Sequence, residues 1–433
     1  MTTLYSLFLL HPTVTTDSRN CPKGSIFFAL KGDSFNGNEF AAAALEKGCA
    51  YAVIDEAQYA VDDRYIVVPD VLTTLQQLAN EHRRALGTPI IGVTGTNGKT
   101  TTKELIATVL SEKFNVHYTQ GNFNNHIGVP KTLLQLTRDH DIAVVEMGAN
   151  HPGEIKTLVD IVEPNFGIIT NVGKAHLEGF GSFEGVVKTK GELYDKLRQH
   201  SDTRTFIDAD NEHLAGIAEG LTLIKYGVES NADDLAVRGR VGECAPFLTF
   251  DWSMPQKAEV GVHHVDTHLI GAYNIYNMLA AATIGTYFGV TPEQVDHALA
   301  NYIPSNNRSQ LTVTDHNKLI VDTYNANPTS MAAALKNFAL MKVENKMAIL
   351  GDMRELGEAS AEEHQKVVDT LKADGITNVW LVGEAFGNTA CDFRKFPDVE
   401  AVKAALTTEQ PQDQYILIKG SNSIKLFQLP ELL

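Results

Sequence analysis

The sequence is poor in cysteine, and the few cysteines are widely spaced. Four are present, none of them in a C-x-x-C pair: Cys21, Cys49, Cys244 and Cys391. Structural zinc sites and disulfide frameworks both need cysteines at close, regular spacing. We therefore predict neither, and we expect reduced thiols in a cytoplasmic protein.

Basic charge is also scarce. Lys and Arg number 36 against 53 Asp and Glu, which gives a formal net charge of −17. Proteins that bind nucleic acid generally need a basic surface, so we expect no nucleic-acid partner. A phosphate-bearing small molecule stays compatible with this charge, because a few local cations and backbone amides are enough to hold it.

Long hydrophobic runs are missing as well. The apolar stretch "LYSLFLL" covers only residues 4–10, whereas a membrane-spanning helix needs about 20 residues. No basic residue precedes it, so it lacks the charged start of a signal peptide. We expect it to form a first core helix or strand, and we expect no membrane partner.

What the sequence does contain is a regular alternation of apolar strand and helix patterns. At roughly 150 residues per domain, its 433 residues indicate two to four domains. Alternating strands and helices predict an α/β fold with parallel sheets. We place three domains at residues 1–87, 88–306 and 307–433.

The first two predicted domains begin with distinct patterns. The first contains the strand candidate "SIFFALKG", a helix and strand in "EFAAAALEKGCAYAVID", and a helix "TTLQQLANEHRRAL" that ends at "GTPI". The second opens on "IIGVTG", a β-branched run typical of a buried parallel strand. It continues with a helix, two more apolar runs, shorter strands over residues 202–270 and the helix "NIYNMLAAATIGTYFG".

The third predicted domain is a second small α/β unit. Polarity rises around "IPSNNRSQ", where we place the boundary. Strands are then expected, with helices between them, in "KLIVDTYN", "KMAILGDM", "NVWLVGEA" and "YILIKGS".

Residues 91–102, "IGVTGTNGKTTT", resemble a phosphate-binding loop with one glycine missing. In the pattern G-x-x-x-x-G-K-[ST], Gly98, Lys99 and Thr100 fit, but Val93 stands at the first glycine. The loop joins a strand to a helix, which is where anions bind in open α/β sheets. Gly95 allows close backbone approach, Lys99 supplies a cation, and Thr100 can ligate Mg²⁺. The alternative is a glycine-rich turn with an exposed lysine.

Three further polar residues follow strands of the same domain. Glu146 ends "IAVVE" and would bring carboxylate charge to a Mg²⁺ held by Thr100. His176 follows "IITNVGKA", and by itself could be a capping or packing histidine. Lys190, placed near the start of a helix, would by itself be a solvated lysine.

A pair of histidines in "HHVDTH" has the spacing of some metal ligands. His264 and His268 are four residues apart, but no glutamate occupies the H-E-x-x-H position and the stretch is predicted as a strand. We therefore expect no metal site there.

Taken together, these motifs resemble the Mur ligase family. The matching stretches are "TGTNGKTTT", "EMGANHPGEI", "NVGKAHLEGFGSFEGVVKTKGEL", "GAYNIYNMLAA" and "DTYNANPTSM", in the family's order. The stretch "DSRNCPKGSIFFALKGDSFNGNEF" resembles the UDP-binding domain of the last two enzymes of the family. "GDMRELGE" resembles the final one, which adds D-alanyl-D-alanine. The resemblance implies a small N-terminal UDP-binding domain, a central P-loop ATPase-like domain and a C-terminal Rossmann-like domain.

The resemblance also implies roles for individual residues. Lys99 would contact ATP phosphates and Thr100 the first of two Mg²⁺ ions, while Glu146 would bind Mg²⁺ and, with His176, hold the second. Lys190 would carry a carbamate, which turns this cation into an anionic metal ligand. Asn274 and Asn277 would lie near the adenine, Arg308 would approach the γ-phosphate, and Asp322 would support the closed nucleotide site. The remaining implied ATP-binding residues are Gly95, Thr96, Asn97, Gly98, Thr101 and Asn325.

For the substrate, the resemblance implies UDP-N-acetylmuramoyl-tripeptide and D-alanyl-D-alanine as partners of a monomeric enzyme. Ser18 and Arg19 would help hold the uridine diphosphate, and Lys31, Asn124 and Asn125 would also bind the substrate. The chain departs from the family's usual pattern at three positions, which affects local contacts: His126, Asn307 and Asn422.

The implied reaction is ATP-driven amide formation through an acyl phosphate. One alternative is the preceding ligase, which adds the third residue and usually carries a "DNP" motif; "NANP" and "GDMRELG" are found instead. Folylpolyglutamate synthase shares the ATP core but lacks the "DSR" domain. A nucleotide-binding switch would need only the loop, not Glu146, His176 and Lys190 as well.

Overall fold

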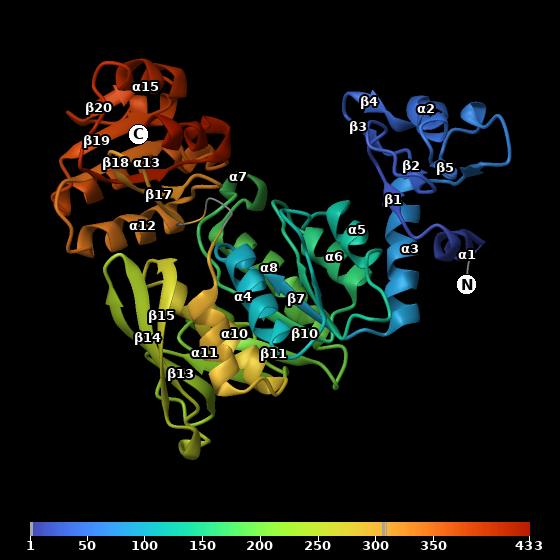
Figure 1. The fold of residues 1–433 in the computed structure, drawn as a ribbon, viewed down its shortest axis with the longest axis horizontal. Helices are drawn as coiled ribbons and strands as arrows, with labels where there is room; N and C mark the ends of the chain where they lie inside the picture. The colour runs from blue at the N-terminus through green and yellow to red at the C-terminus, as the bar shows by residue number, and fades with distance from the viewer. Residues whose placement is uncertain (1–2, 305–307, 309) are drawn as a thin grey trace.

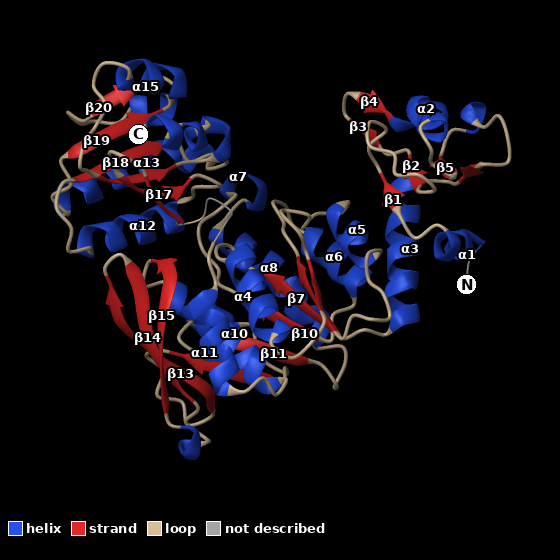
Figure 2. Ribbon diagram, viewed as in Figure 1, coloured by secondary structure: helices blue, strands red, loops and turns tan. Residues whose placement is uncertain are grey.

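The computed structural model describes residues 3–304, 308 and 310–433. The predicted boundary at residue 306 and the departure at Asn307 lie outside these described residues. Three separate sheets form the framework, one each in the N-terminal, central and C-terminal parts of the described chain (Figures 1 and 2). Among the described residues, no helix combines the length and the apolar character needed to cross a membrane.

The N-terminal sheet is small and wholly parallel, in the order β1-β2-β5-β6. The predicted helix or strand at residues 4–10 is a helix, and it buries Tyr5 and Phe8. A short hairpin of β3 and β4 projects beside this sheet. The elements are α1 Thr3–Leu10, β1 Val14–Thr15, β2 Ile26–Phe28, β3 Lys31–Gly32, β4 Phe35–Asn36, α2 Ala41–Glu46, β5 Tyr51–Ile54, β6 Tyr65–Val67 and α3 Val71–Leu86.

Helix α3 links this sheet to the central domain. It begins after Asp70, whose carboxylate accepts from the Thr73 amide at 2.6 Å, and it ends at Gly87 in the left-handed conformation. Its apolar face belongs to the same buried cluster as α5 and α6. Figure 2 shows α3 lying alongside these two helices. The guanidinium Nε of Arg83 also donates to the Val162 carbonyl at 2.9 Å, at the end of α6.

The central sheet has the order β15-β14-β13-β12-β11-β10-β7-β9-β8. The strands from β8 to β13 are parallel, and β13, β14 and β15 pair antiparallel at one edge. Its strands are β7 Ile90–Thr94, β8 Val116–Tyr118, β9 Ile142–Glu146, β10 Phe166–Ile169, β11 Arg204–Asp208, β12 Leu223–Gly227, β13 Leu235–Cys244, β14 Phe247–Ser253 and β15 Val262–Ile270.

The expectation of shorter strands over residues 202–270 is wrong for this antiparallel edge. β13, β14 and β15, with 10, 7 and 9 residues, are the longest strands of the described chain. Along β14 buried and half-buried residues alternate. A sheet covered on one face gives such a broken apolar pattern, so these strands carry no long apolar run in the sequence.

Helices cover both faces of the central sheet, as predicted. On one face, α4, α10 and α11 form a core with the sheet; on the other, α5, α6 and α8 do so. The central helices are α4 Lys99–Ser111, α5 Gly128–Leu133, α6 Glu154–Val162, α7 Leu177–Phe180, α8 Phe183–Leu197, α9 Glu212–Gly216, α10 Asn274–Tyr287 and α11 Pro292–Asn301.

The C-terminal sheet has the order β16-β17-β21-β18-β19-β20, parallel except for β16. The four strands predicted from apolar runs are all present. The elements are β16 Gln310–Val313, β17 Lys318–Asp322, α12 Pro328–Leu340, β18 Lys346–Gly351, α13 Ser360–Ala373, β19 Asn378–Val382, α14 Glu384–Gly387, β20 Arg394–Phe396, α15 Val399–Leu406 and β21 Tyr415–Lys419.

Candidate functional site

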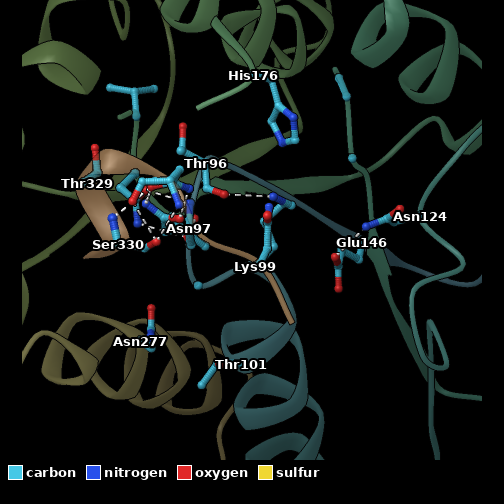
Figure 3. Close-up of a pocket in the computed structure, with 18 of the residues that line it drawn as sticks. Thr96, Asn97, Lys99, Thr101, Asn124, Glu146, His176, Asn277, Thr329 and Ser330 are labelled. Atoms are coloured by element: carbon cyan, nitrogen blue, oxygen red, sulfur yellow. Dashed lines mark hydrogen bonds between the residues drawn. The ribbon is translucent and has the colours of Figure 1, made fainter. Parts of the chain in front are cut away.

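A cleft of about 1190 Å³ lies between the carboxyl edge of the central sheet and the C-terminal domain. Most of the predicted site residues line it, from both domains, and Figure 3 shows the phosphate loop at its centre. The predicted residues that line the cleft are Thr96, Asn97, Gly98, Lys99, Thr101, Asn124, Asn125, Glu146, His176, Asn274, Asn277, Arg308, Asp322 and Asn325.

The position of the missing glycine lies inside β7 rather than in the phosphate loop. Val93 is fully buried within that strand, so no glycine is needed at its position. The chain turns only at Gly95, with φ of 142°, and Gly98, with φ of 76°. A Cβ on Gly95 would lie 2.1 Å from the Thr170 hydroxyl. Both turn positions therefore require glycine.

Asn171, which was not among the predicted site residues, holds this loop in place. Its side-chain oxygen accepts from the Asn97 amide at 3.0 Å, and its side-chain nitrogen donates to the Asn97 carbonyl, also at 3.0 Å. Both backbone hydrogen-bonding groups of Asn97 are thus fixed by one side chain. The only indication in the sequence was that Asn171 stands two residues after the apolar run of β10.

Lys99 folds back over its own loop. Its Nζ donates to the Gly95 carbonyl at 2.9 Å and to the Thr96 carbonyl at 3.0 Å. Burial lowers the pKa of Lys99 to about 8, with a further lowering from Arg308 and an opposing effect of Glu146. Both acceptors are neutral carbonyls, so a phosphate bound in the cleft would give the Lys99 ammonium a negatively charged partner.

Glu146 is buried at the end of β9 and has one free carboxylate oxygen. Its Oε1 accepts from the Thr100 hydroxyl at 3.2 Å and from the Asn124 side chain at 2.8 Å. Its Oε2 is buried and has no partner among the described residues. An orphaned carboxylate oxygen beside a threonine hydroxyl matches the oxygen ligands that Mg²⁺ prefers.

This metal site would not be a cage made by protein alone. Within the described ranges, no three His, Cys, Asp or Glu side chains are grouped so as to hold a metal ion. Mg²⁺ sites typically use one or two carboxylates and complete their shell with water and substrate phosphates. Thr100 and Glu146 fit that arrangement.

His176 lies at the cleft and precedes α7, with φ of 50°. Its ring points toward the side of the cleft that holds Lys99 and Glu146 (Figure 3). Its Nδ1 pairs with the carboxylate of Glu355 from the C-terminal domain. Burial lowers the pKa of His176, Glu355 opposes this, and the charges of Lys99 and Lys190 lower it further.

Lys190 corrects two expectations. It lies in the middle of α8, which begins after Ser182 because the Ser182 hydroxyl accepts from the Gly185 amide at 3.1 Å. It is also buried, with 2% exposure, rather than solvated. Its Nζ donates to the Ala149 carbonyl at 3.2 Å and lies 5.2 Å from the centre of the Phe180 ring. Burial, and then the charge of Lys99, hold the pKa of Lys190 well below its usual range.

Asn277 connects the first turn of α10 to Thr102 of α4, and Asn274 supports Asn277. The Asn277 side chain donates to the Asn274 side chain at 2.8 Å and accepts from the Thr102 hydroxyl at 3.0 Å. Its oxygen would lie 2.8 Å from a Cβ on Gly98. The two asparagines are therefore at the floor of the cleft, beneath the loop.

The C-terminal wall of the cleft contains an ion pair of which the sequence predicted only one partner. Asp322 was predicted, and its carboxylate accepts from Lys419 Nζ at 2.6 Å. Lys419 also donates to the Asn325 carbonyl at 3.3 Å. Arg308 stacks on the Tyr324 ring at 3.8 Å. The signal for Lys419 was a charge ending an apolar strand, the same signal that marked Glu146.

The predicted substrate residues of the N-terminal domain do not reach this cleft. The Arg19 side chain is 87% exposed and pairs with Asp17 at 2.9 Å, which lowers the pKa of Asp17 to about 2. Lys31 pairs with two carboxylates beside the N-terminal sheet. The Ser18 carbonyl accepts from Lys47 Nζ at 2.7 Å.

Three predicted residues of the central domain do not line the cleft surface either: Gly95, Thr100 and Lys190.

The remaining sequence predictions concern single positions. His264 and His268 lie on β15, as expected, and His264 pairs with Asp251 at 2.7 Å. His126 lines the cleft, whereas Asn422 is exposed near the C-terminus.

Three family models match the chain. They are the Mur ligase middle domain over residues 93–285, the Mur ligase glutamate ligase domain over residues 307–422, and the Mur ligase family catalytic domain over residues 12–83.

Individual relatives match over most of their length. A UDP-N-acetylmuramoyl-tripeptide–D-alanyl-D-alanine ligase from Synechocystis is 36% identical, covering 95% of this chain and 90% of the relative. The enzyme of that name from Bacillus subtilis is 35% identical, covering 86% and 80%. The crystal structure of a Thermotoga maritima MurF ligase in complex with ADP superposes with a TM-score of 0.86 at 25% identity, covering 100% and 98%.

Proposed function

Because the chain belongs to the Mur ligase family, we propose that it joins D-alanyl-D-alanine to UDP-N-acetylmuramoyl-tripeptide in a reaction driven by ATP. This is the last cytoplasmic step in the synthesis of the peptidoglycan precursor. The observation that carries the proposal is the convergence of Lys99, Glu146 and His176 on one cleft that the C-terminal domain completes. The two relatives named for this reaction match over 80% and 90% of their own length.

The reaction proceeds in two displacements. A terminal carboxylate oxygen of the tripeptide attacks the γ-phosphorus of ATP, the bond to the β–γ bridging oxygen breaks, and ADP leaves with that electron pair. The product is an acyl phosphate. The amine of D-alanyl-D-alanine then attacks the acyl carbon, the carbon–oxygen bond to phosphate breaks, and the nitrogen loses a proton. An amide and inorganic phosphate result.

The first displacement brings a carboxylate up to a polyphosphate, so the site must offset the repulsion between them. Lys99 and the first-turn amides of α4 would hold the phosphates, because the amides of Thr96 and Asn97 already donate to Asn171. Thr100 and Glu146 would hold Mg²⁺, which supplies further positive charge to the transferring phosphoryl group. Arg308 would approach the γ-phosphate, and Asp322 would support the closed site through its pair with Lys419.

We further propose that Lys190 carries a carbamate and that His176 and Glu146 hold a second metal ion. The support is chemical. An amine attacks CO₂ only when it is neutral, and the depressed pKa of the buried Lys190 favours that form. The Nζ forms a bond to the CO₂ carbon and loses a proton. The neutral amine thus becomes an anionic carbamate, which suits a metal ligand.

The substrates would enter from opposite sides. Asn274 and Asn277 would lie near the adenine on the α10 side of the cleft. The cleft also reaches Leu72 and Gln76 of α3, and this end faces the N-terminal domain. The uridine diphosphate would lie beyond this end of the cleft, against Ser18, Arg19 and Lys31 of the N-terminal domain. The peptide would extend from it past Asn124 and Asn125. We expect a monomer acting in the cytoplasm.

The test is phosphate release from ATP and Mg²⁺ in the presence of UDP-N-acetylmuramoyl-tripeptide. D-alanyl-D-alanine is compared with single amino acids as acceptor, and products are identified by mass. Release that requires the dipeptide, with a pentapeptide product, is the expected result. Release with a diamino acid and a dipeptide-bearing nucleotide would instead identify the preceding ligase.

A further inference from the structure

One carboxylate from the C-terminal domain contacts the site on the central domain. Glu355 lies in the loop between β18 and α13, and its carboxylate pairs with Nδ1 of His176. Its carbonyl accepts from the Glu178 amide at 3.3 Å. Both ends of one residue therefore bind the segment that begins α7. The reaction proposed above assigns no role to Glu355.

The loop that carries Glu355 is fixed by bonds to three other elements. Asp352 is buried and accepts from the amides of Ala385 and Phe386, at 3.0 and 2.9 Å. The amide of Met353 donates to the buried His364 ring at 3.0 Å. The amide of Arg354 donates to the Ser421 hydroxyl, also at 3.0 Å. A loop anchored at three successive residues presents the next side chain in a defined direction.

Glu355 itself has a backbone conformation that glutamate rarely adopts, with φ of 62°. Residues held in this region usually depend on surrounding contacts that fix them. The neighbouring Leu356 is buried at 3% exposure, which secures the chain on the other side. The surrounding contacts thus hold the Glu355 backbone in a conformation that residues with a side chain disfavour.

The pairing has a direct consequence for the imidazole. A neutral histidine ring has one N–H donor and one acceptor nitrogen, and a carboxylate at Nδ1 selects the tautomer with the proton there. Nε2 is then left with its lone pair. A carboxylate in this arrangement also fixes the ring orientation of metal-binding histidines.

We propose that Glu355 is a positioning residue that sets the tautomer and orientation of His176, so that Nε2 is available to the cleft only while the C-terminal domain is docked. This inference rests on the proposed function. It joins domain closure to the completion of the site, because the two residues come from different domains.

The competing explanation is that this pair only fastens the two domains together. The same interface offers a contact that does not touch His176, namely Lys174 Nζ to Glu363 at 3.4 Å. Glu363→Ala therefore removes this contact, together with the pair of Glu363 and Lys366 on the same helix, and leaves the pair of Glu355 and His176 in place. Glu355→Gln keeps an oxygen that can accept from Nδ1–H, and Glu355→Ala removes it.

The first readout is the ¹⁵N NMR spectrum of the histidine rings in the nucleotide-free protein. The His176 signal is identified by its loss in His176→Asn, among 15 histidines. The wild type and Glu355→Gln should show Nδ1–H, whereas Glu355→Ala should move toward Nε2–H. Glu363→Ala should match the wild type.

The second readout is Mn²⁺ affinity in the presence of a non-hydrolysable ATP analogue, with the kinetic constants beside it. Glu355→Ala should lower Mn²⁺ affinity and kcat about 10- to 100-fold, the usual effect of removing such a partner. The KM for each substrate should change by less than about threefold. Glu355→Gln should restore most of the loss.

Two results would overturn the proposal: an unchanged His176 tautomer in Glu355→Ala, or an equal loss of Mn²⁺ affinity in Glu363→Ala. Failure of the wild type to ligate D-alanyl-D-alanine would instead overturn the proposed function. The tautomer comparison uses no substrate, so the two failures are distinguishable.

Discussion

The side-chain nitrogen of Asn327 donates to the side-chain oxygen of Asn97 at 2.8 Å and joins the phosphate loop to the C-terminal domain. The same Asn327 caps α12, because its side-chain oxygen accepts from the Ser330 amide at 2.8 Å. One residue therefore begins a helix of one domain and contacts the nucleotide loop of another.

Asn327→Ala should remove both interactions. Loss of the cap should destabilise the C-terminal domain by about 1 kcal/mol, and loss of the bond to Asn97 should raise the KM for ATP. Asn327→Ser retains a capping oxygen but is too short to reach Asn97. Urea unfolding should therefore separate the two variants, while the ATP titration should not. Equal stability of both variants would contradict the capping role.

Replacing Gly98 tests the tight turn of the phosphate loop. Gly98→Ala introduces a Cβ about 2.8 Å from the Asn277 oxygen at a backbone φ of 76°. The conformation alone costs about 1–2 kcal/mol, and the close contact should displace Asn277 and weaken ATP binding. Gly153 has a similar φ of 83° with nothing within 4 Å of its added Cβ. Gly153→Ala should lower the melting temperature and leave the Kd for ATP unchanged.

ATP binding should depend on pH through Lys99. Its pKa of about 8 means that the free protein loses this positive charge as pH rises through that value, well below the usual 10.5 for lysine. The kcat/KM for ATP, which reports groups of the free enzyme, should therefore fall as pH rises above about 8. Lys99→Arg stays charged and should give a lower but flat profile. A wild-type profile that is flat from pH 7 to 9 would contradict this reading.

The carbamate proposed for Lys190 can be tested by chemical rescue. Lys190→Ala should abolish ligation while ATP still binds, and a short carboxylic acid should restore part of the activity. Lys188 lies on the same helix but is exposed, so Lys188→Ala should behave as wild type. In the wild type, ¹³CO₂ should give a carbamate signal that Lys190→Ala lacks. Full activity of Lys190→Ala without rescue would exclude the assignment.

The features that could be predicted from sequence are those with a local cause. A β-branched run followed by glycines and GKT identifies a strand, a loop and a helix, and in the structure Lys99 begins that helix. A carboxylate at the end of an apolar strand placed Glu146. Both signals lie within a few residues of the side chain they identify.

The features that could not be predicted depend on distant segments. Lys190 was expected to be solvated, because its burial comes from the chain at Ala149 and Phe180 rather than from its own helix. The role of Lys419 depends on its ion pair with Asp322, which is 97 residues away in the sequence. The contact of Glu355 with His176 joins two domains, and no motif spacing in the sequence predicts it.

Helix α3 has a consequence for how this chain can be divided. Its apolar side chains, among them Leu75 and Leu78, belong to the buried cluster that includes Val129 and Leu133 of the central domain. A fragment that starts at residue 88 would leave that surface exposed to water and prone to aggregation. A cut before Asp70 keeps that surface covered but separates α3 from Tyr5 and Phe8, which pack against it in the same cluster. Either cut opens a shared core, so an experimenter who divides the gene should expect both pieces to lose stability.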